Sequence, residues 1–134
     1  MSFRAAVRDG FSRYVGFSGR TSRSGYWWWQ LFVVAGLFST VFVDSLLLGD
    51  HPRSGVSSSG SAAQGLFLLI VFVPSVTVLV RRLHDSGLSA WWALAFLIPV
   101  AGFFIWLIYT TRSSTPGPNR FGPETTGTTV VGAP

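Results

Sequence analysis

Three long apolar segments dominate the chain of 134 residues and restrict how it can fold. They cover residues 26–48, 62–80 and 90–109, and the only formal charge in the first of them is Asp44. A helix rises about 1.5 Å per residue, so about 20 residues are enough to cross a hydrocarbon core of about 30 Å. Each segment has about this length. The sequence therefore predicts an all-α integral membrane protein with three transmembrane helices.

The composition argues against a soluble domain. Only 11% of the residues are charged and 16% are aromatic, whereas about a quarter of the residues of a soluble domain are charged. A domain of this size cannot bury so much apolar area in one core. The chain has no cysteine, which excludes disulfides and thiolate metal sites, and we predict no cofactor. The first apolar segment begins 25 residues into the chain and is longer than a signal-peptide core, so we expect it to be retained.

The arginines predict the orientation in the membrane. All ten basic residues are arginine. With three full spans and a cytoplasmic N-terminus, seven arginines are cytoplasmic and three are outside. The reverse orientation inverts this ratio, so the positive-inside rule favours a cytoplasmic N-terminus in a bacterial plasma membrane. The seven are Arg4, Arg8, Arg13, Arg20, Arg23, Arg81 and Arg82, and the three are Arg53, Arg112 and Arg120.

Tryptophans are expected to anchor the helices at the two membrane interfaces, where amphipathic rings collect. Most of them open the first and third segments, at the predicted cytoplasmic interface, and one marks the far interface together with Tyr109. The predicted anchors are Trp27, Trp28, Trp29, Trp91 and Trp92 on the cytoplasmic side and Trp106 on the far side.

The third segment has an alternative path. Pro99 and Gly102 lie in its middle, where a re-entrant hairpin would turn back. Nine arginines would then be cytoplasmic and one outside, which is a better charge balance. The segment is, however, only one span long, and a re-entrant backbone must be shielded by protein. The full span is therefore the main prediction, and it places the C-terminus outside.

The polar ends of the chain form separate regions. Residues 1–25 are a basic cytoplasmic segment, residues 26–110 the membrane domain, and residues 111–134 a tail rich in proline and glycine that we expect to be disordered after 123. The connector 49–60 is rich in serine and glycine and is expected to be flexible.

Residues 3–15 predict an amphipathic helix that lies in the membrane interface. Its apolar residues recur on one face of a helix with 3.6 residues per turn, and arginines flank that face, within reach of lipid phosphates. Gly10 weakens this helix by about 1 kcal/mol relative to alanine. The alternative is a disordered basic arm. The apolar face comprises Phe3, Val7, Phe11, Tyr14 and Val15, and the flanking residues are Arg4, Arg8 and Arg13.

Three short motifs suggest a family. FSGRTSR at 17–23 precedes Tyr26-Trp27, RRLHDSG at 81–87 precedes Trp91-Trp92, and GPNRFGP occupies 117–123. Over about residues 11–124 this order resembles the bacterial DUF805 family, and the block 81–85 is its most specific element. The resemblance implies a small bacterial inner-membrane protein and no particular activity.

One position departs from the family pattern. Family members usually have an acidic residue directly before the Tyr-Trp pair, where this chain has Gly25. The departure removes an acidic partner for Arg20 or Arg23. The candidate functional residues come from the three motifs and from the one charged residue inside the first apolar segment. They are Arg20, Arg23, Asp44, Arg81, Arg82, His84, Asp85, Asn119 and Arg120.

The densest polar cluster, Arg81 to Asp85, has two interpretations. In a functional one, His84 and Asp85 handle protons or bind a metal. In a structural one, Asp85 begins a turn, Ser89 caps the third helix, and Arg81 and Arg82 bind phosphates. One histidine and one aspartate are too few for a closed metal site. The structural interpretation is therefore favoured.

Asp44 lies about one turn, ~6 Å, from the end of its span. Ionised residues inside membranes are functional candidates, but at this depth the side chain can also reach the outer interface.

We predict a non-enzymatic scaffold or modulator of a membrane partner or lipid surface. One alternative is an oligomeric pathway for a small solute or ion that uses Asp44, and another is a membrane enzyme that uses His84 and Asp85. The expected partners are the lipid bilayer with its anionic headgroups, and further copies of the chain or another membrane protein, but not nucleic acid.

Overall fold

The computed structural model describes residues 1–48 and 62–125, and the regular structure in this part of the chain is helical apart from one isolated bridge between Asn119 and Gly122. This confirms the predicted all-α class. The predicted connector 49–60 and the tail beyond 125 lie outside the described residues. The elements are α1 (Phe3–Ser12), α2 (Arg23–Leu48), α3 (Ala62–Asp85), the 3₁₀-helix η1 (Ala90–Leu97) and α4 (Pro99–Thr111).

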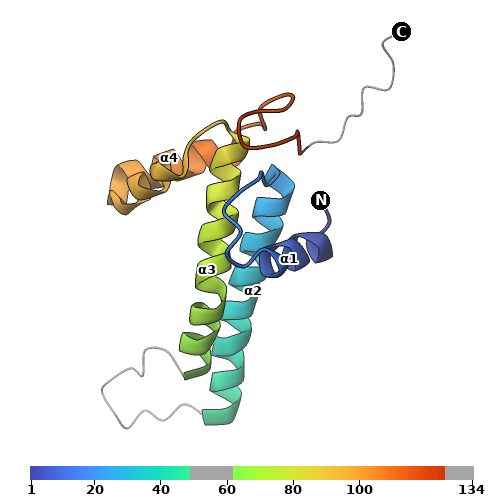
Figure 1. Ribbon diagram of the computed structural model, residues 1–134. Coiled ribbons are helices and arrows are strands. Elements are labelled where there is room, and N and C mark those ends of the chain that lie inside the picture. Colours follow the sequence, from blue (N-terminus) through green and yellow to red (C-terminus); the bar gives the residue numbers. More distant parts are fainter. Residues whose placement is uncertain (49–61, 126–134) are drawn as a thin grey trace.

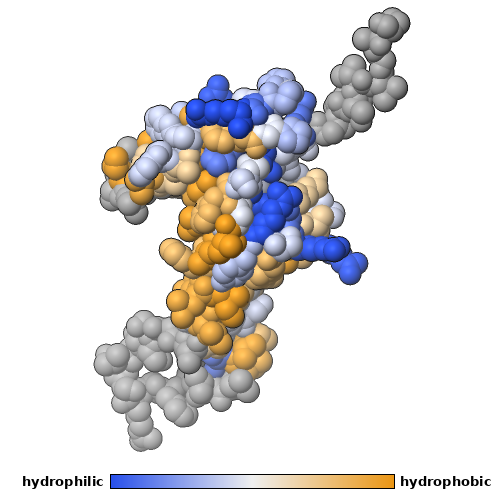
Figure 2. Space-filling model, viewed as in Figure 1, coloured by the Kyte–Doolittle hydropathy of each residue, from blue (hydrophilic) through white to orange (hydrophobic). Residues whose placement is uncertain are grey.

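The long helices α2 and α3 run side by side and form the axis of the molecule (Figure 1). With 26 and 24 residues, they are about 39 and 36 Å long, and both are apolar enough to cross a membrane. Large apolar side chains point outward along them, for example Phe38 and Leu69, which are 72% and 73% exposed. Figure 2 shows this apolar surface along the lower part of the helix pair. Long apolar helices are thus confirmed over the first two predicted spans, and α3 continues past the predicted end at Val80 to Asp85.

Gly36 lets α2 and α3 approach each other closely. A Cβ atom at this position would lie 2.1 Å from Cζ of Phe67, so the ring of Phe67 occupies the space that a larger residue would fill. The ring of Phe32 lies one turn away on α2, 6.3 Å from that of Phe67 between centroids. Small residues have this role at many helix contacts in membranes.

The third apolar segment is not one straight helix. The 3₁₀-helix η1 ends at Leu97, Ile98 has an extended backbone (φ −83°, ψ 112°), and α4 begins at Pro99. A proline disfavours helical geometry in the residue before it and has no N–H for the preceding turn, but it suits the first position of a new helix. The two short helices contact each other and both contact α3.

The path of the chain therefore follows the alternative in which the segment turns back at Pro99. With 13 residues, α4 is only about 20 Å long, which is too short for a span. In Figure 1 the pair formed by η1 and α4 extends sideways from the end of α3.

The N-terminal segment forms the predicted helix, but α1 ends at Ser12 and not at residue 15. It lies across the long helices (Figure 1). Phe11 packs edge-on against Trp29 and Phe32, with centroid distances of 5.3 and 5.7 Å. Gly10 is buried, and a Cβ there would lie 2.3 Å from the ring of Trp29. The glycine that weakens the helix is thus required for its docking.

Pro74 explains where the N-terminal segment attaches to α3. Because proline has no N–H, the carbonyl of Ile70, four residues earlier, lacks its helical donor. The hydroxyl of Tyr14 donates to this carbonyl at 2.7 Å. Thr77 donates to the carbonyls of both Val73 and Tyr14 at 3.0 Å. Residues 13–22 then continue along α3 toward its C-terminal end (Figure 1).

Candidate functional site

The polar residues collect at one end of the molecule. We call residues 1–29 and 74–125 the head, and residues 30–48 and 62–73 the stem. In Figure 2 the hydrophilic residues gather over the head, which also carries hydrophobic surface, and the stem is mainly hydrophobic. Within the described residues all arginines belong to the head, and Arg53 lies outside them. The head arginines are Arg4, Arg8, Arg13, Arg20, Arg23, Arg81, Arg82, Arg112 and Arg120.

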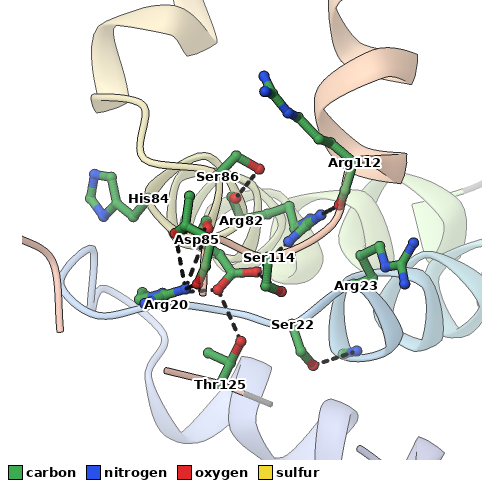
Figure 3. A network of polar contacts seen from close by, with 12 residues as sticks. Arg20, Ser22, Arg23, Arg82, His84, Asp85, Ser86, Arg112, Ser114 and Thr125 are labelled. Carbon is green, nitrogen blue, oxygen red and sulfur yellow. Dashed lines mark hydrogen bonds and ion pairs between the residues drawn. The ribbon is translucent and has the colours of Figure 1, made fainter. Parts of the chain in front are cut away.

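Asp85, the last residue of α3, is the centre of the head and is 0% exposed. Arg20 donates through Nε to one carboxylate oxygen at 2.9 Å, and Arg82 donates through Nη1 to the other. The hydroxyl of Ser114 donates to the oxygen that Arg82 uses, and that of Thr125 donates to the first oxygen at 2.9 Å. Figure 3 shows these groups converging on the carboxylate. Such complete hydrogen bonding is what allows a buried ion pair to persist.

The same two arginines tie the C-terminal segment to the head. Arg20 donates to the carbonyls of Thr115 at 2.7 Å and Gly117 at 2.8 Å. Arg82 donates to the carbonyls of Thr110 at 3.3 Å and Arg112.

The three motifs of the sequence therefore form one composite site. This corrects the main prediction, in which a third full span would have carried residues 111–125 to the opposite end. Because the 90–109 segment turns back, those residues return to the motif that ends α3.

The side chains of His84 and Asp85 make separate sets of contacts. The ring of His84 stacks on Phe121 at 3.9 Å between centroids, and its Nδ1 lies 3.3 Å from the carbonyl of Gly19. Asn119 donates to the backbone carbonyl of His84 at 3.1 Å. The described residues contain no group of three or more potential metal ligands.

Arg120 lies at the edge of this region. Its guanidinium sits 4.6 Å from the centre of the Phe121 ring and its side chain is exposed.

Arg81 and Arg82 do not face lipid phosphates, which corrects the earlier interpretation. Both are 0% exposed, because the N-terminal segment and the tail cover that end of α3. Arg81 pairs with Asp9 of α1 at 2.7 Å, and Asp9 also pairs with Arg13 at 2.9 Å. Sequence reasoning missed Asp9. The sequence feature that could have identified Asp9 as a partner of an arginine is that it is the only acidic residue in the basic N-terminal segment, residues 1–25.

The tryptophans divide into exposed and buried ones. Trp27 and Trp28 are each 39% exposed and Trp91 and Trp92 are 78% and 42% exposed, and for these four the anchor role stays a prediction. Trp29, in contrast, is 1% exposed and donates to Ser75 at 3.1 Å. Successive helical residues are about 100° apart, so the third residue of the Trp run turns toward α1 and α3.

Trp106 is not at a far interface. Its Nε1 donates to the hydroxyl of Tyr26 at 2.6 Å, and its ring lies 5.8 Å from that of Trp27. It belongs to the head because α4 returns there.

Arg23 and Asp44 lie apart from the central cluster. Arg23 is exposed, and its guanidinium donates to the carbonyl of Thr111 at 3.3 Å. Asp44 is in the stem, 21 residues along α2 from Arg23, which corresponds to about 31 Å. The structure thus places the candidate residues of all three motifs in the head, with Arg23 outside the cluster around Asp85, and it leaves Asp44 at the other end.

Gly25 lies in close contact with neighbouring side chains. A Cβ atom there would lie 2.6 Å from Sδ of Met1 and 3.2 Å from Cγ2 of Thr21, so a larger residue requires these side chains to move. Arg20 instead obtains its carboxylate from Asp85, 65 residues away in the sequence.

Comparisons with known proteins agree with the motifs. The family model described as "Protein of unknown function (DUF805)" matches residues 14–123. The chain is 40% identical to the inner membrane protein YhaH of Escherichia coli (strain K12), over 83% of this chain and 88% of that protein. It is 36% identical to the inner membrane protein YhaI of the same strain, over 83% and 86% of the two chains. No solved structure gives a significant match. With its two membrane-length apolar helices, the chain is thus a membrane protein and belongs to the DUF805 family.

Proposed function

We propose that this chain is a non-enzymatic protein of the bacterial inner membrane, and that its head is a cytoplasmic scaffold for a membrane partner or lipid surface. The observation that carries the proposal is the state of Asp85, whose carboxylate receives four side-chain hydrogen bonds from within the chain. A carboxylate whose two oxygens both accept hydrogen bonds from within the chain holds the donating segments together. The most specific motif of the chain therefore builds a rigid surface.

The same geometry speaks against the enzyme alternative. A general acid or base must reach the proton that it transfers, and Asp85 is 0% exposed. One face of the His84 ring is covered by Phe121. These contacts give both residues a structural role that does not require a substrate.

The outer surface of the head supports a role at the membrane surface. Besides the exposed tryptophans of α2 and η1, the head carries five exposed arginines that form no ion pair within the described residues, a combination that suits anionic headgroups. These arginines are Arg4, Arg8, Arg23, Arg112 and Arg120.

The proposed cytoplasmic location rests on the distribution of charge. Because residues 111–125 return to the head, nine of the ten arginines belong to one end of the molecule. The positive-inside rule then favours a cytoplasmic head more strongly than three full spans would. Both the N-terminal segment and the tail would face the cytoplasm.

Reporter fusions test this topology. We expect alkaline phosphatase to be inactive and a fluorescent protein to be bright when either is fused at the N-terminus or after Thr125. Alkaline phosphatase inserted between residues 49 and 60 should be active. An active phosphatase at the C-terminus would refute the shared cytoplasmic location.

Photo-crosslinking in intact membranes tests the scaffold role. A photoreactive residue is placed at Arg112 or Arg120 in the head, and at the matched exposed stem positions Phe42 and Phe72. We expect the head positions to yield either a discrete protein adduct or an adduct with anionic lipid. The crosslinked protein can be a second copy of the chain or another membrane protein. The stem positions should yield lipid without headgroup preference. Equal adduct patterns at both ends would contradict the proposal.

A further inference from the structure

A cavity separates the beginning of α2 from the segment that follows α4. Its volume is about 410 Å³, and one guanidinium and four serines line it. The lining residues are Ser22, Arg23, Ser24, Ser113 and Ser114. Figure 3 shows Ser22, Arg23 and Ser114 on the side of the polar network away from His84. A space with this lining suits a polar, negatively charged group.

The charges next to the cavity are unbalanced. Arg20 and Arg82 both pair with Asp85, so two buried cations share one carboxylate. Ser114 connects this group to the cavity, because it lines the cavity and donates to Asp85. The pairings leave a surplus positive charge beside the cavity wall. An anion in the cavity would be attracted to it, and partial burial strengthens that attraction relative to bulk water.

Arg23 adds a second cation that an anion could use. The ion pairs within the described residues involve Arg13, Arg20, Arg81 and Arg82, whereas Arg23 donates to the carbonyl of Thr111. Its guanidinium therefore neutralises no carboxylate in this part of the chain. A guanidinium recognises a phosphate through paired N–H donors.

The serines place hydroxyl groups around the same space. Ser22 accepts a hydrogen bond from the N–H of Gly25 at 3.3 Å, and its oxygen is 3.3 Å from that of Ser24. Because only one of these two hydroxyls donates to the other, the second proton stays available to a ligand. Ser113 is exposed on the opposite wall. Both walls can thus donate hydrogen bonds to a tetrahedral anion.

From this lining and the surplus charge we infer that the cavity binds a phosphate group, held by Arg23 and the serine hydroxyls. The phosphate belongs either to an anionic phospholipid headgroup or to a soluble phosphate. The inference deepens the proposed function, because it names a ligand for the head.

The test uses the purified full chain in an uncharged maltoside detergent. One arm titrates inorganic phosphate, and the other titrates short-chain phosphatidylglycerol, with binding measured by calorimetry and native mass spectrometry. Arg23→Gln is compared with Arg4→Gln, which removes the same charge from an exposed head position outside the cavity. We expect Arg23→Gln to weaken binding about tenfold or more and Arg4→Gln to change it by less than about twofold.

Ser113→Asp provides a second, independent variant. It places a carboxylate on the cavity wall at an exposed position, so it should abolish binding while the thermal unfolding temperature remains near that of the wild type.

The outcomes separate the two phosphate sources. Arg23-dependent binding of both probes indicates recognition of the phosphate alone, whereas binding of one probe only identifies the lipid or the soluble source. The inference is overturned if neither probe binds saturably, or if Arg4→Gln and Arg23→Gln weaken binding equally. If the cavity binds nothing while photo-crosslinking at Arg120 still captures a partner, the inference fails and the proposed function stands.

Discussion

The head and the stem hold the same two helices together by different means. In the stem, α2 and α3 approach closely at Gly36 and Phe67, Val71 is buried between apolar side chains, and most other side chains are exposed. In the head, Arg20, Arg82 and Asp85 are buried and hydrogen-bonded. The stem needs little more than length and apolarity, whereas the head needs particular residues in particular places. The comparison suggests that stability and specificity are concentrated in the head.

Replacing Asp85 by asparagine should have the largest effect. The two arginines would then be buried without a carboxylate, and breaking a buried ion pair in this way costs about 3–5 kcal/mol. Denaturant unfolding in micelles measures the loss. Asp44→Asn removes the same charge from the stem and should change the free energy of unfolding by less than about 1 kcal/mol. Equal losses in the two variants would remove the distinction between head and stem.

Two glycine substitutions should act in opposite directions. Gly10→Ala in the head places a Cβ atom against the ring of Trp29, and such overpacking costs about 1–3 kcal/mol. Gly65→Ala in the stem meets no atom within 4 Å and should stabilise α3 by up to about 1 kcal/mol, because alanine is the better helix former. The same unfolding assay measures both, and a stabilising Gly10→Ala would show that α1 is not docked as described.

The contact at Pro74 can be tested with a double-mutant cycle. Tyr14→Phe leaves the carbonyl of Ile70 without a donor and should cost about 1–2 kcal/mol. Pro74→Ala restores a backbone N–H for that carbonyl, so Tyr14→Phe should cost much less in its presence. Additive losses in the double variant would argue against the proposed link. Tyr109→Phe, which removes a hydroxyl elsewhere in the head, serves as the control.

Neighbouring tryptophans should show the smallest difference. Trp29→Phe loses the hydrogen bond to Ser75 and should cost about 1 kcal/mol, whereas Trp28→Phe, at a partly exposed position, should cost less than about 0.5 kcal/mol. Unfolding measured by far-ultraviolet circular dichroism can resolve the difference in free energy of unfolding between the two variants. If Trp28→Phe lowers the free energy of unfolding more than Trp29→Phe does, Trp28 is the buried residue and Trp29 the exposed one, contrary to the structure.

Part of the site was readable from the sequence and part was not. The three motifs were recognised as the polar candidates, and all of them meet in the head. Their internal pairing was not predictable, because Asp85 and Arg20 are 65 residues apart and no local pattern connects them. Asp9 and Ser114 were missed for the same reason, since each partners an arginine or a carboxylate from another helix.

The sequence by itself determined the all-α membrane class, the two long spans and the helix at the N-terminus, because segment length, apolarity and helical periodicity are local properties. Only the tertiary structure decided which path the 90–109 segment takes, which of three adjacent tryptophans is buried, and which carboxylate each arginine finds. These depend on contacts between distant segments. Pro99 permits both a kinked span and a return, and the bonds from Arg20 and Arg82 to the carbonyls of residues 110–117 hold the returning chain.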